Sequence, residues 1–168
     1  MEERNCTSPQ EKTFSRNEMK NYIMTSGVGI DKHKLVSFDK ALLSSRIANY
    51  NIVKVSSILP PGCNPQIEVS AAHGSVLFTA YASISSCNEE LLSAAIGVGI
   101  PTSAEDVGVI MEYSCREGKA TAEETVREMV KASMDLRKID IQEIKVVSAE
   151  AKATCGEFTT VIAALAMW

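Results

Sequence analysis

The sequence has few aromatic residues, only two histidines and no cluster of Lys and Arg. Phe, Tyr and Trp together make up 5% of the chain, and the net charge is −4. A protein that binds nucleic acid or an anionic membrane needs a concentrated basic face, which this sequence does not offer. We therefore expect neither nucleic acid nor a membrane to be its partner.

Closely spaced cysteines and long apolar runs are also absent. No two of the five cysteines are closer than 24 residues, so the sequence indicates neither a disulfide framework nor a zinc motif, and we expect no metal. The first residues contain no apolar signal segment. The longest apolar run, Val161 to Trp168, is too short to span a bilayer. These absences predict a cytoplasmic protein.

The composition that remains is that of a globular domain. A chain of 168 residues with 45% hydrophobic residues is long enough to build one core without disulfides. Residues 1–17 are polar and lack periodicity, which predicts a flexible tail. We expect residues 18–168 to form a single domain.

Alternating, apolar and β-branched runs predict strands over residues 22–30, 52–59, 75–84, 107–114, 139–154 and 157–168. Residues 91–100 are apolar and fit a helix or a strand, and their two glycines favour a strand. Two amphipathic stretches predict helices. Ser37 is expected to cap the first, which runs to about Ala48. Thr121 to Glu124 match a capping box at the start of the second, which runs to about Lys138. This order predicts an α+β fold in which two main helices cover mostly antiparallel sheets.

One predicted strand reaches two adjacent hydroxyls, Ser56 and Ser57, and then stops at Pro60-Pro61. A serine hydroxyl held against the preceding carbonyl can attack it and turn the peptide bond into an ester, which β-elimination then breaks. The dipeptide alone does not identify such a site, because Ser-Ser also occurs at 44–45 and 85–86. An ordinary strand or turn residue is the other interpretation of each pair.

Three further polar residues each have two interpretations, one structural and one functional. Asp39 falls in the first turn of the first predicted helix, where a carboxylate interacts favourably with the helix dipole. Asn51 follows that helix and could cap it. Glu112 is a lone carboxylate in an apolar strand, on the same face as Ile110 and Ser114, where a solvent-facing position would also explain it.

Several of these segments together resemble the pyruvoyl-dependent arginine decarboxylases. In chain order they are Thr25 to Gly29, Phe38 to Leu42, Asn49 to Asn51, Val55 to Pro61 and Val109 to Tyr113. The family's motifs occur in this same order. The resemblance covers the chain from about Tyr22 to Trp168. It implies a layered αββα sandwich that assembles as a trimer, which is paired into a hexamer in some members, with active sites between neighbouring subunits.

The resemblance also implies a self-processing chain. Cleavage between Ser56 and Ser57 would give a β chain of residues 1–56 and an α chain of residues 57–168. The positions that match Asp39 and Asn51 contact the substrate or the cleavage region in the family, and the carboxylate that matches Glu112 donates a proton. Asp39 would receive the substrate guanidinium, and the Asn51 amide could stabilise the Ser56 carbonyl during cleavage.

The function that the resemblance implies is conversion of L-arginine to agmatine and CO₂. The substrate amine would form an imine with the pyruvoyl group made from Ser57, which accepts the electrons that pyridoxal phosphate accepts in other decarboxylases, so neither PLP nor metal is needed. Two alternatives remain open. One is a pyruvoyl decarboxylase for another amino acid such as histidine or lysine, and the other is a non-enzymatic trimeric ligand-binding protein of the same fold.

Overall fold

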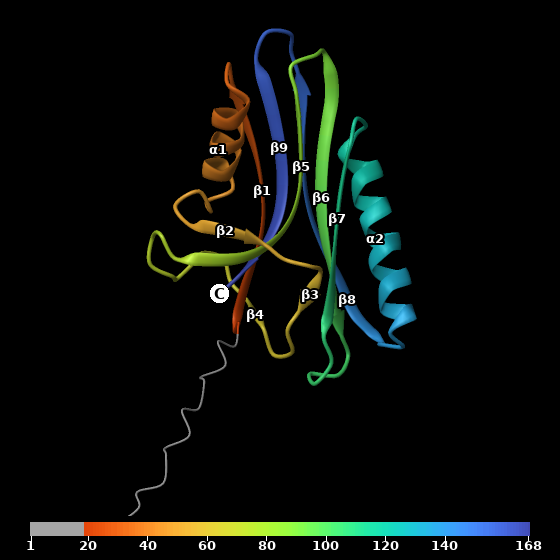
Figure 1. The fold of residues 1–168 in the computed structure, drawn as a ribbon. Helices are drawn as coiled ribbons and strands as arrows, with labels where there is room; N and C mark the ends of the chain where they lie inside the picture. The colour runs from red at the N-terminus through yellow and green to blue at the C-terminus, as the bar shows by residue number, and fades with distance from the viewer. Residues whose placement is uncertain (1–18) are drawn as a thin grey trace, which may run out of the picture.

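The structure, a computed structural model, describes residues 19–168, in which two β-sheets pack face to face and one helix covers the outer face of each (Figure 1). This arrangement confirms the predicted α+β class and the αββα layers. The flexible tail expected for residues 1–17 lies outside the described residues.

The helices are α1 (Lys34–Ser44) and α2 (Lys119–Leu136). The strands, in chain order, are β1 (Asn21–Asp31), β2 (Asn51–Lys54), β3 (Ile58–Leu59), β4 (Asn64–Pro65), β5 (Val76–Ser86), β6 (Glu90–Pro101), β7 (Gly108–Cys115), β8 (Ile141–Ala153) and β9 (Phe158–Met167). The long strands and both helices lie within a few residues of the positions that the sequence predicts.

The first sheet has the strand order β2-β5-β9-β1-β4, and the second has the order β3-β7-β6-β8. Pairing is mostly antiparallel, with parallel pairs only at β1 with β4 and at β2 with β5. The apolar strand β9 lies between β5 and β1 and is buried along nearly its whole length, as its continuous apolar sequence predicts. The main core fills the space between the two sheets.

Two glycine pairs let the helices approach the sheets closely. A Cβ at Gly27 or Gly29 would collide with the backbone of α1, at Ala41 and Ser37 respectively. A Cβ at Gly97 would collide with Val126 of α2, and one at Gly99 would crowd Val130 and Met134. The glycines therefore allow each helix to pack closely against its sheet, once in each half of the molecule.

The predicted start of the first helix is wrong. The helix begins at Lys34 after His33, and Ser37 is buried one turn inside it. Its hydroxyl donates to the Lys34 carbonyl at 2.8 Å and also meets the Thr160 hydroxyl of β9 at 2.7 Å. Ser37 therefore joins the helix to the sheet. Asp39 lies in the middle of α1 and not in its first turn, so the helix-dipole explanation for Asp39 does not hold.

The predicted capping box of the second helix is also wrong. Helix α2 begins at Lys119, two residues before Thr121, and Gly118 occupies the cap position without a side-chain hydrogen bond. The Lys119 backbone N–H donates at 2.8 Å to the carboxylate of Glu150 on β8. A carboxylate distant in sequence thus satisfies one of the free N–H groups at the helix start.

The strand expected over residues 52–59 is broken in two. Its first part, β2, pairs in parallel with β5 of the first sheet, whereas its second part, β3, pairs antiparallel with β7 of the second sheet. Val55, Ser56 and Ser57 belong to neither strand. The chain crosses from one sheet to the other at the serine pair.

Neither helix in residues 19–168 combines the length and the apolar character that crossing a bilayer would require.

Candidate functional site

The serine pair lies at one edge of the sandwich. Strands β2 and β3 are the edge strands of their sheets, and Ser56-Ser57 connects them (Figure 1). Ser56 is exposed and Ser57 is half-buried. The bond between them is therefore held between two sheets and is not paired in either.

Three backbone hydrogen bonds fix this crossing. The Val55 N–H donates to the Thr79 carbonyl of β5 at 3.2 Å, which ties the segment to the first sheet. The Ile110 N–H of β7 donates to the Ser57 carbonyl at 2.8 Å, which ties it to the second. Between these anchors the Ile58 N–H folds back and donates to the Ser56 carbonyl at 2.9 Å. Each carbonyl of the serine pair thus has its own backbone donor.

Glu112 faces the space between the sheets. It shares a face of β7 with Ile110, as the alternation predicts, but Ile110 belongs to the core between the sheets. The solvent-facing interpretation of Glu112 is therefore wrong, and its side chain is 23% exposed. The Ser57 hydroxyl donates to Glu112 Oε2 at 3.4 Å, which is longer than a strong hydrogen bond but within reach of one.

Lys54 is part of this site, and sequence reasoning did not identify it. Its Nζ lies 3.6 Å from Glu112 Oε1, donates to the Tyr81 carbonyl at 2.9 Å and sits 4.6 Å from the centre of the Tyr81 ring. The signal in the sequence is a single charge in the apolar run just before the serine pair. Its link to Glu112 depends on the crossing between the sheets, which the sequence pattern does not reveal.

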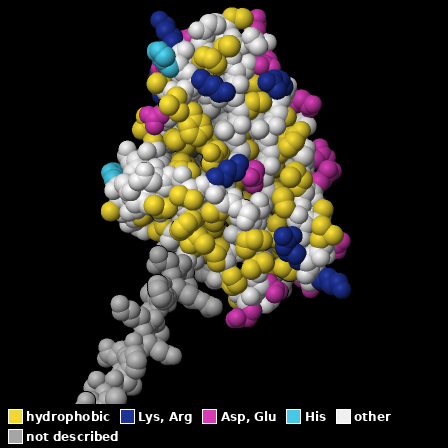
Figure 2. Space-filling view, in the orientation of Figure 1, with side chains coloured by type: hydrophobic (Ala, Val, Ile, Leu, Met, Phe, Trp, Pro, Cys, Tyr) yellow, Lys and Arg dark blue, Asp and Glu magenta, His cyan; other side chains and the backbone are white. Residues whose placement is uncertain are grey.

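A hollow of about 470 Å³ opens at this site, lined by Lys54, Tyr81, Ala82, Ser83, Glu112, Tyr113 and Ser114. A neighbouring hollow, which shares Ser83, is lined by Lys34, Leu35, Phe38, Ser83 and Ser85 and extends towards α1. Figure 2 shows that hydrophobic side chains cover much of this face, and that a basic and an acidic side chain lie side by side near its middle. The site is an open surface depression and not an enclosed cavity.

The structure does not bring Asn51 to the Ser56 carbonyl. Asn51 lies at the start of β2 and is exposed, and its Nδ2 donates to the Gly74 carbonyl at 2.6 Å. Its backbone N–H donates to the Ser75 carbonyl at 2.9 Å. Both groups hold the loop before β5 against β2.

Asp39 is also separate from the serine pair in a single chain. It is exposed on α1, and within residues 19–168 its side chain forms no hydrogen bond or ion pair. Its neighbour Phe38 contacts Tyr81, with 6.2 Å between ring centres, so α1 borders the hollow that contains Lys54 and Glu112. Asp39 is near the border of the site but not in contact with its reactive groups.

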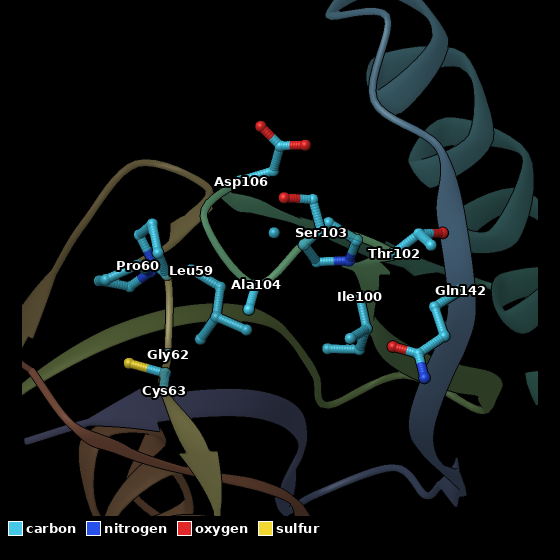
Figure 3. A pocket seen from close by; sticks show the side chains of 13 residues that line it. Leu59, Pro60, Gly62, Cys63, Ile100, Thr102, Ser103, Ala104, Asp106 and Gln142 are labelled. Atoms are coloured by element: carbon cyan, nitrogen blue, oxygen red, sulfur yellow. The ribbon is translucent and has the colours of Figure 1, made fainter.

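A third hollow lies beyond β3 (Figure 3). Its volume is about 210 Å³, and Leu59, Pro60 and Cys63 face it from one side, with Gln142 on the other. Asp106 contributes a carboxylate to the lining of this hollow. Neither Ser57 nor Glu112 lines this hollow, so it is separate from the site around the serine pair.

Titrating groups with shifted pKa values lie away from the serine pair. Lys40 and the backbone N–H of His33 lower the pKa of Asp31 to about 2, at the end of β1. Burial raises the pKa of the Cys63 thiol, whose sulfur donates to the Met19 carbonyl. Among residues 19–168 no group of three or more His, Cys, Asp or Glu side chains is arranged to hold a metal ion.

The arrangement at the serine pair suits acyl chemistry at a backbone carbonyl. A hydroxyl follows the Ser56 carbonyl, a backbone donor holds the carbonyl oxygen, and a carboxylate paired with an ammonium stands beside the hydroxyl. An attack of the Ser57 hydroxyl on this carbonyl would close a five-membered ring. These are the components needed to rearrange the peptide bond before Ser57 into an ester.

Comparison with known proteins gives a consistent result. Residues 21–168 match the model of the family described as pyruvoyl-dependent arginine decarboxylase. A protein of that name from Methanococcus vannielii is 39% identical over 146 residues, covering 86% of this chain and 88% of the relative. Those from Methanocaldococcus jannaschii and Pyrococcus abyssi are 35% and 39% identical, covering 86% and 78% of this chain and 87% and 84% of the relatives.

Proposed function

The chain belongs to the pyruvoyl-dependent arginine decarboxylase family, and on this basis we propose that it cuts itself between Ser56 and Ser57 and then decarboxylates L-arginine to agmatine and CO₂. Its relatives are named pyruvoyl-dependent arginine decarboxylases, and it is an enzyme of that class, a carboxy-lyase. The observation that carries the proposal is the position of the serine pair, which lies outside both sheets with Glu112 beside the Ser57 hydroxyl.

Cleavage proceeds through ester formation, elimination and hydrolysis. The Ser57 Oγ bonds to the Ser56 carbonyl carbon, the C–N bond breaks, and the hydroxyl proton ends on the freed amine. Elimination then removes the Ser57 Cα proton to a base, its electron pair forms the Cα=Cβ double bond, and the Cβ–Oγ bond breaks. Oγ leaves with the Ser56 carboxylate, and Ser57 becomes dehydroalanine. One water molecule replaces the nitrogen, which leaves as ammonia. Residue 57 becomes a pyruvoyl group at the start of the α chain of residues 57–168.

The residues around Ser57 fit such a group. When present, it supplies the electron-accepting carbonyls that decarboxylation of an amino acid requires. The Ser57 carbonyl would be one of them, and the Ile110 N–H already donates to its oxygen at 2.8 Å. This donor is fixed in β7, so it binds the oxygen where negative charge develops without reorganisation.

Glu112 is proposed as the proton donor to the substrate carbon. It borders the open hollow and lies next to Ser57, so its carboxyl can reach a substrate bound at residue 57. Lys54 holds one oxygen of Glu112, and the Tyr81 carbonyl and ring hold Lys54 in turn. A positioned general acid contributes about 10²–10⁴ in rate.

Arginine recognition is proposed for Asp39, through paired hydrogen bonds from the guanidinium. In one chain Asp39 makes no contact with Ser57, Glu112 or Lys54 within the described residues. A second copy of the chain could bring Asp39 to the hollow of its neighbour. This agrees with the trimer, in some members paired into a hexamer, that the family resemblance implies. We propose this assembly, and a cytoplasmic location, as parts of the function to be tested.

The mass of the purified chain tests the proposal directly. We expect two fragments, residues 1–56 and 57–168, with the second beginning at a pyruvoyl group, and inactivation by borohydride or hydroxylamine. Assays of CO₂ release from arginine, lysine and histidine then identify the substrate. A chain that stays in one piece, or an activity that needs added pyridoxal phosphate, would contradict the proposal.

A further inference from the structure

The backbone at the serine pair contains a three-residue turn centred on Ser57. The Ile58 N–H donates at 2.9 Å to the carbonyl of Ser56, two residues earlier. Among the described residues, positive φ outside glycine occurs only at Arg46 and Lys138, so Ser57 has negative φ. A hydrogen bond over this span with negative φ at the central residue is an inverse γ-turn.

This turn places a donor on the carbonyl that cleavage must attack. When the Ser57 Oγ bonds to the Ser56 carbonyl carbon, an electron pair moves onto the carbonyl oxygen. A donor 2.7–3.1 Å from that oxygen stabilises the charge as it forms, as in the oxyanion holes of acyl-transfer enzymes. The Ile58 N–H meets this distance before the reaction begins.

The anchors on each side keep the turn in place. Val55 is bonded to the first sheet through Thr79, and Ser57 is bonded to the second through Ile110. Because both ends of the turn are tied to different sheets, the Ile58 N–H cannot swing away without breaking β3 from β7. The donor is therefore preorganised by the fold.

We propose that the Ile58 N–H stabilises the oxyanion on the Ser56 carbonyl during self-cleavage, in place of the Asn51 amide. This inference rests on the proposed function, because it concerns the same cleavage. Asn51 is the rival donor that the resemblance suggests, but its Nδ2 is bonded to the Gly74 carbonyl at 2.6 Å. The geometry thus assigns the role to the Ile58 backbone N–H, which a substitution of Asn51 does not remove.

The test replaces one N–H and keeps every side chain. The full-length chain is made by cell-free translation with the α-hydroxy analogue of isoleucine at position 58, which turns the amide into an ester. The same change with the leucine analogue at Leu59 is the matched control, because it lies in the same strand. Asn51→Ala and the unsubstituted chain are made in parallel. Cleavage is followed by intact mass, which separates a cut before Ser57 from hydrolysis of the new ester after it.

We expect the ester at position 58 to slow cleavage before Ser57 by about 10²-fold or more, the usual effect of removing one oxyanion donor. The ester at position 59 and Asn51→Ala should each change the rate by less than about threefold. Equal cleavage of the position-58 ester and the unsubstituted chain overturns the proposal, and so does a large loss confined to Asn51→Ala. If the unsubstituted chain itself stays uncut, the proposed function fails and this inference fails with it.

A second measurement does not depend on how the ester variant folds. The Ser57→Ala chain remains uncut and keeps the backbone, so it can be labelled with ¹⁵N at Ile58 and ¹³C at the Ser56 carbonyl. A through-hydrogen-bond coupling between these nuclei, with slow exchange of the Ile58 N–H, is expected. Exchange as fast as that of an exposed amide would remove Ile58 as the donor.

Discussion

Two serine pairs in this molecule have similar side-chain surroundings and different backbones. Ser57 donates to Glu112, whose other oxygen lies near Lys54. Ser86 donates to Glu90, which is paired with Arg116 at 2.7 Å. Each second serine therefore has a carboxylate that is itself paired with a cation.

The backbones separate the two pairs. Ser85 and Ser86 lie in β5 opposite Thr160 and Thr159 of β9, in a regular antiparallel ladder. Ser56-Ser57 lies between sheets, with the Ser56 carbonyl bonded within a tight turn. If Ser56-Ser57 is the cleavage site, as proposed, a carboxylate beside a serine is not enough to mark it. The feature that distinguishes this pair from Ser85-Ser86 is a peptide bond outside the ladder, held at both ends.

The largest expected effect comes from removing the attacking hydroxyl. Ser57→Ala should leave a single uncut chain with no decarboxylase activity, because the hydroxyl is the nucleophile of the cleavage and its oxygen is also the group that leaves from Cβ when dehydroalanine forms. Ser86→Ala, which removes the equivalent hydroxyl in the ladder, should cut normally. Intact mass decides both. Fragments in the Ser57 variant, or an uncut Ser86 variant, would break the comparison.

The next largest effect is expected at the carboxylates. Glu112→Gln keeps an oxygen that can accept from Ser57, so cleavage should continue, while kcat for arginine falls about 10²–10⁴-fold with loss of the proton donor. Glu90→Gln should leave kcat unchanged. Mass and CO₂ release are measured on the same samples. Normal turnover by Glu112→Gln would exclude Glu112 as the acid.

Asp39 belongs to neither serine pair, so it tests whether recognition is separate from cleavage. Asp39→Ala should cut normally but raise KM for arginine about tenfold, since a charge-assisted hydrogen bond contributes about 1.5 kcal/mol or more. Steady-state kinetics measure the effect, with Asp135→Ala on the exposed surface of α2 as control. An unchanged KM would exclude Asp39 as the group that recognises the guanidinium.

The smallest effect is expected at the paired cations. Lys54→Met should lower kcat by at most about fivefold with little change in KM, as loss of a half-exposed ion pair of about 0.2–1 kcal/mol predicts. Lys54→Arg should restore the rate, and Arg116→Met should have no effect. If Lys54→Met alters KM alone, Lys54 contacts substrate and does not orient Glu112.

The sequence predicts the elements of this fold well and their ends less well. The strand predicted over residues 157–168 is β9, and alternation placed Glu112 on the face of Ile110. The start of α2 could not be predicted, because the carboxylate that accepts a hydrogen bond from the Lys119 backbone N–H comes from Glu150, 31 residues further on. Thr121 had the right local pattern, but the helix had already begun.

The site shows the same limit. The break between Lys54 and Ile58 cannot be seen in the strand-like run of residues 52–59, because it depends on which sheet offers a partner strand to each half. For the same reason Lys54 could not be linked to Glu112, and the Ile58 N–H could not be linked to the Ser56 carbonyl. Asp39 and Asn51 came from the family resemblance, and a role for either in substrate binding stays a prediction. The Asn51 amide is bonded to the Gly74 carbonyl and not to that of Ser56.

The order of strands in the first sheet has a consequence for refolding. Strands β1 and β2 lie before the proposed cut, whereas β5, β9 and β4 lie after it, so the two fragments alternate across one sheet. Cutting one peptide bond leaves this interleaved sheet intact. Once denatured, however, the cut protein must reassemble from two separate molecules, and recovery should depend on protein concentration where recovery of the uncut chain does not. Self-cleavage would turn a chain that folds by itself into a complex that must find its partner.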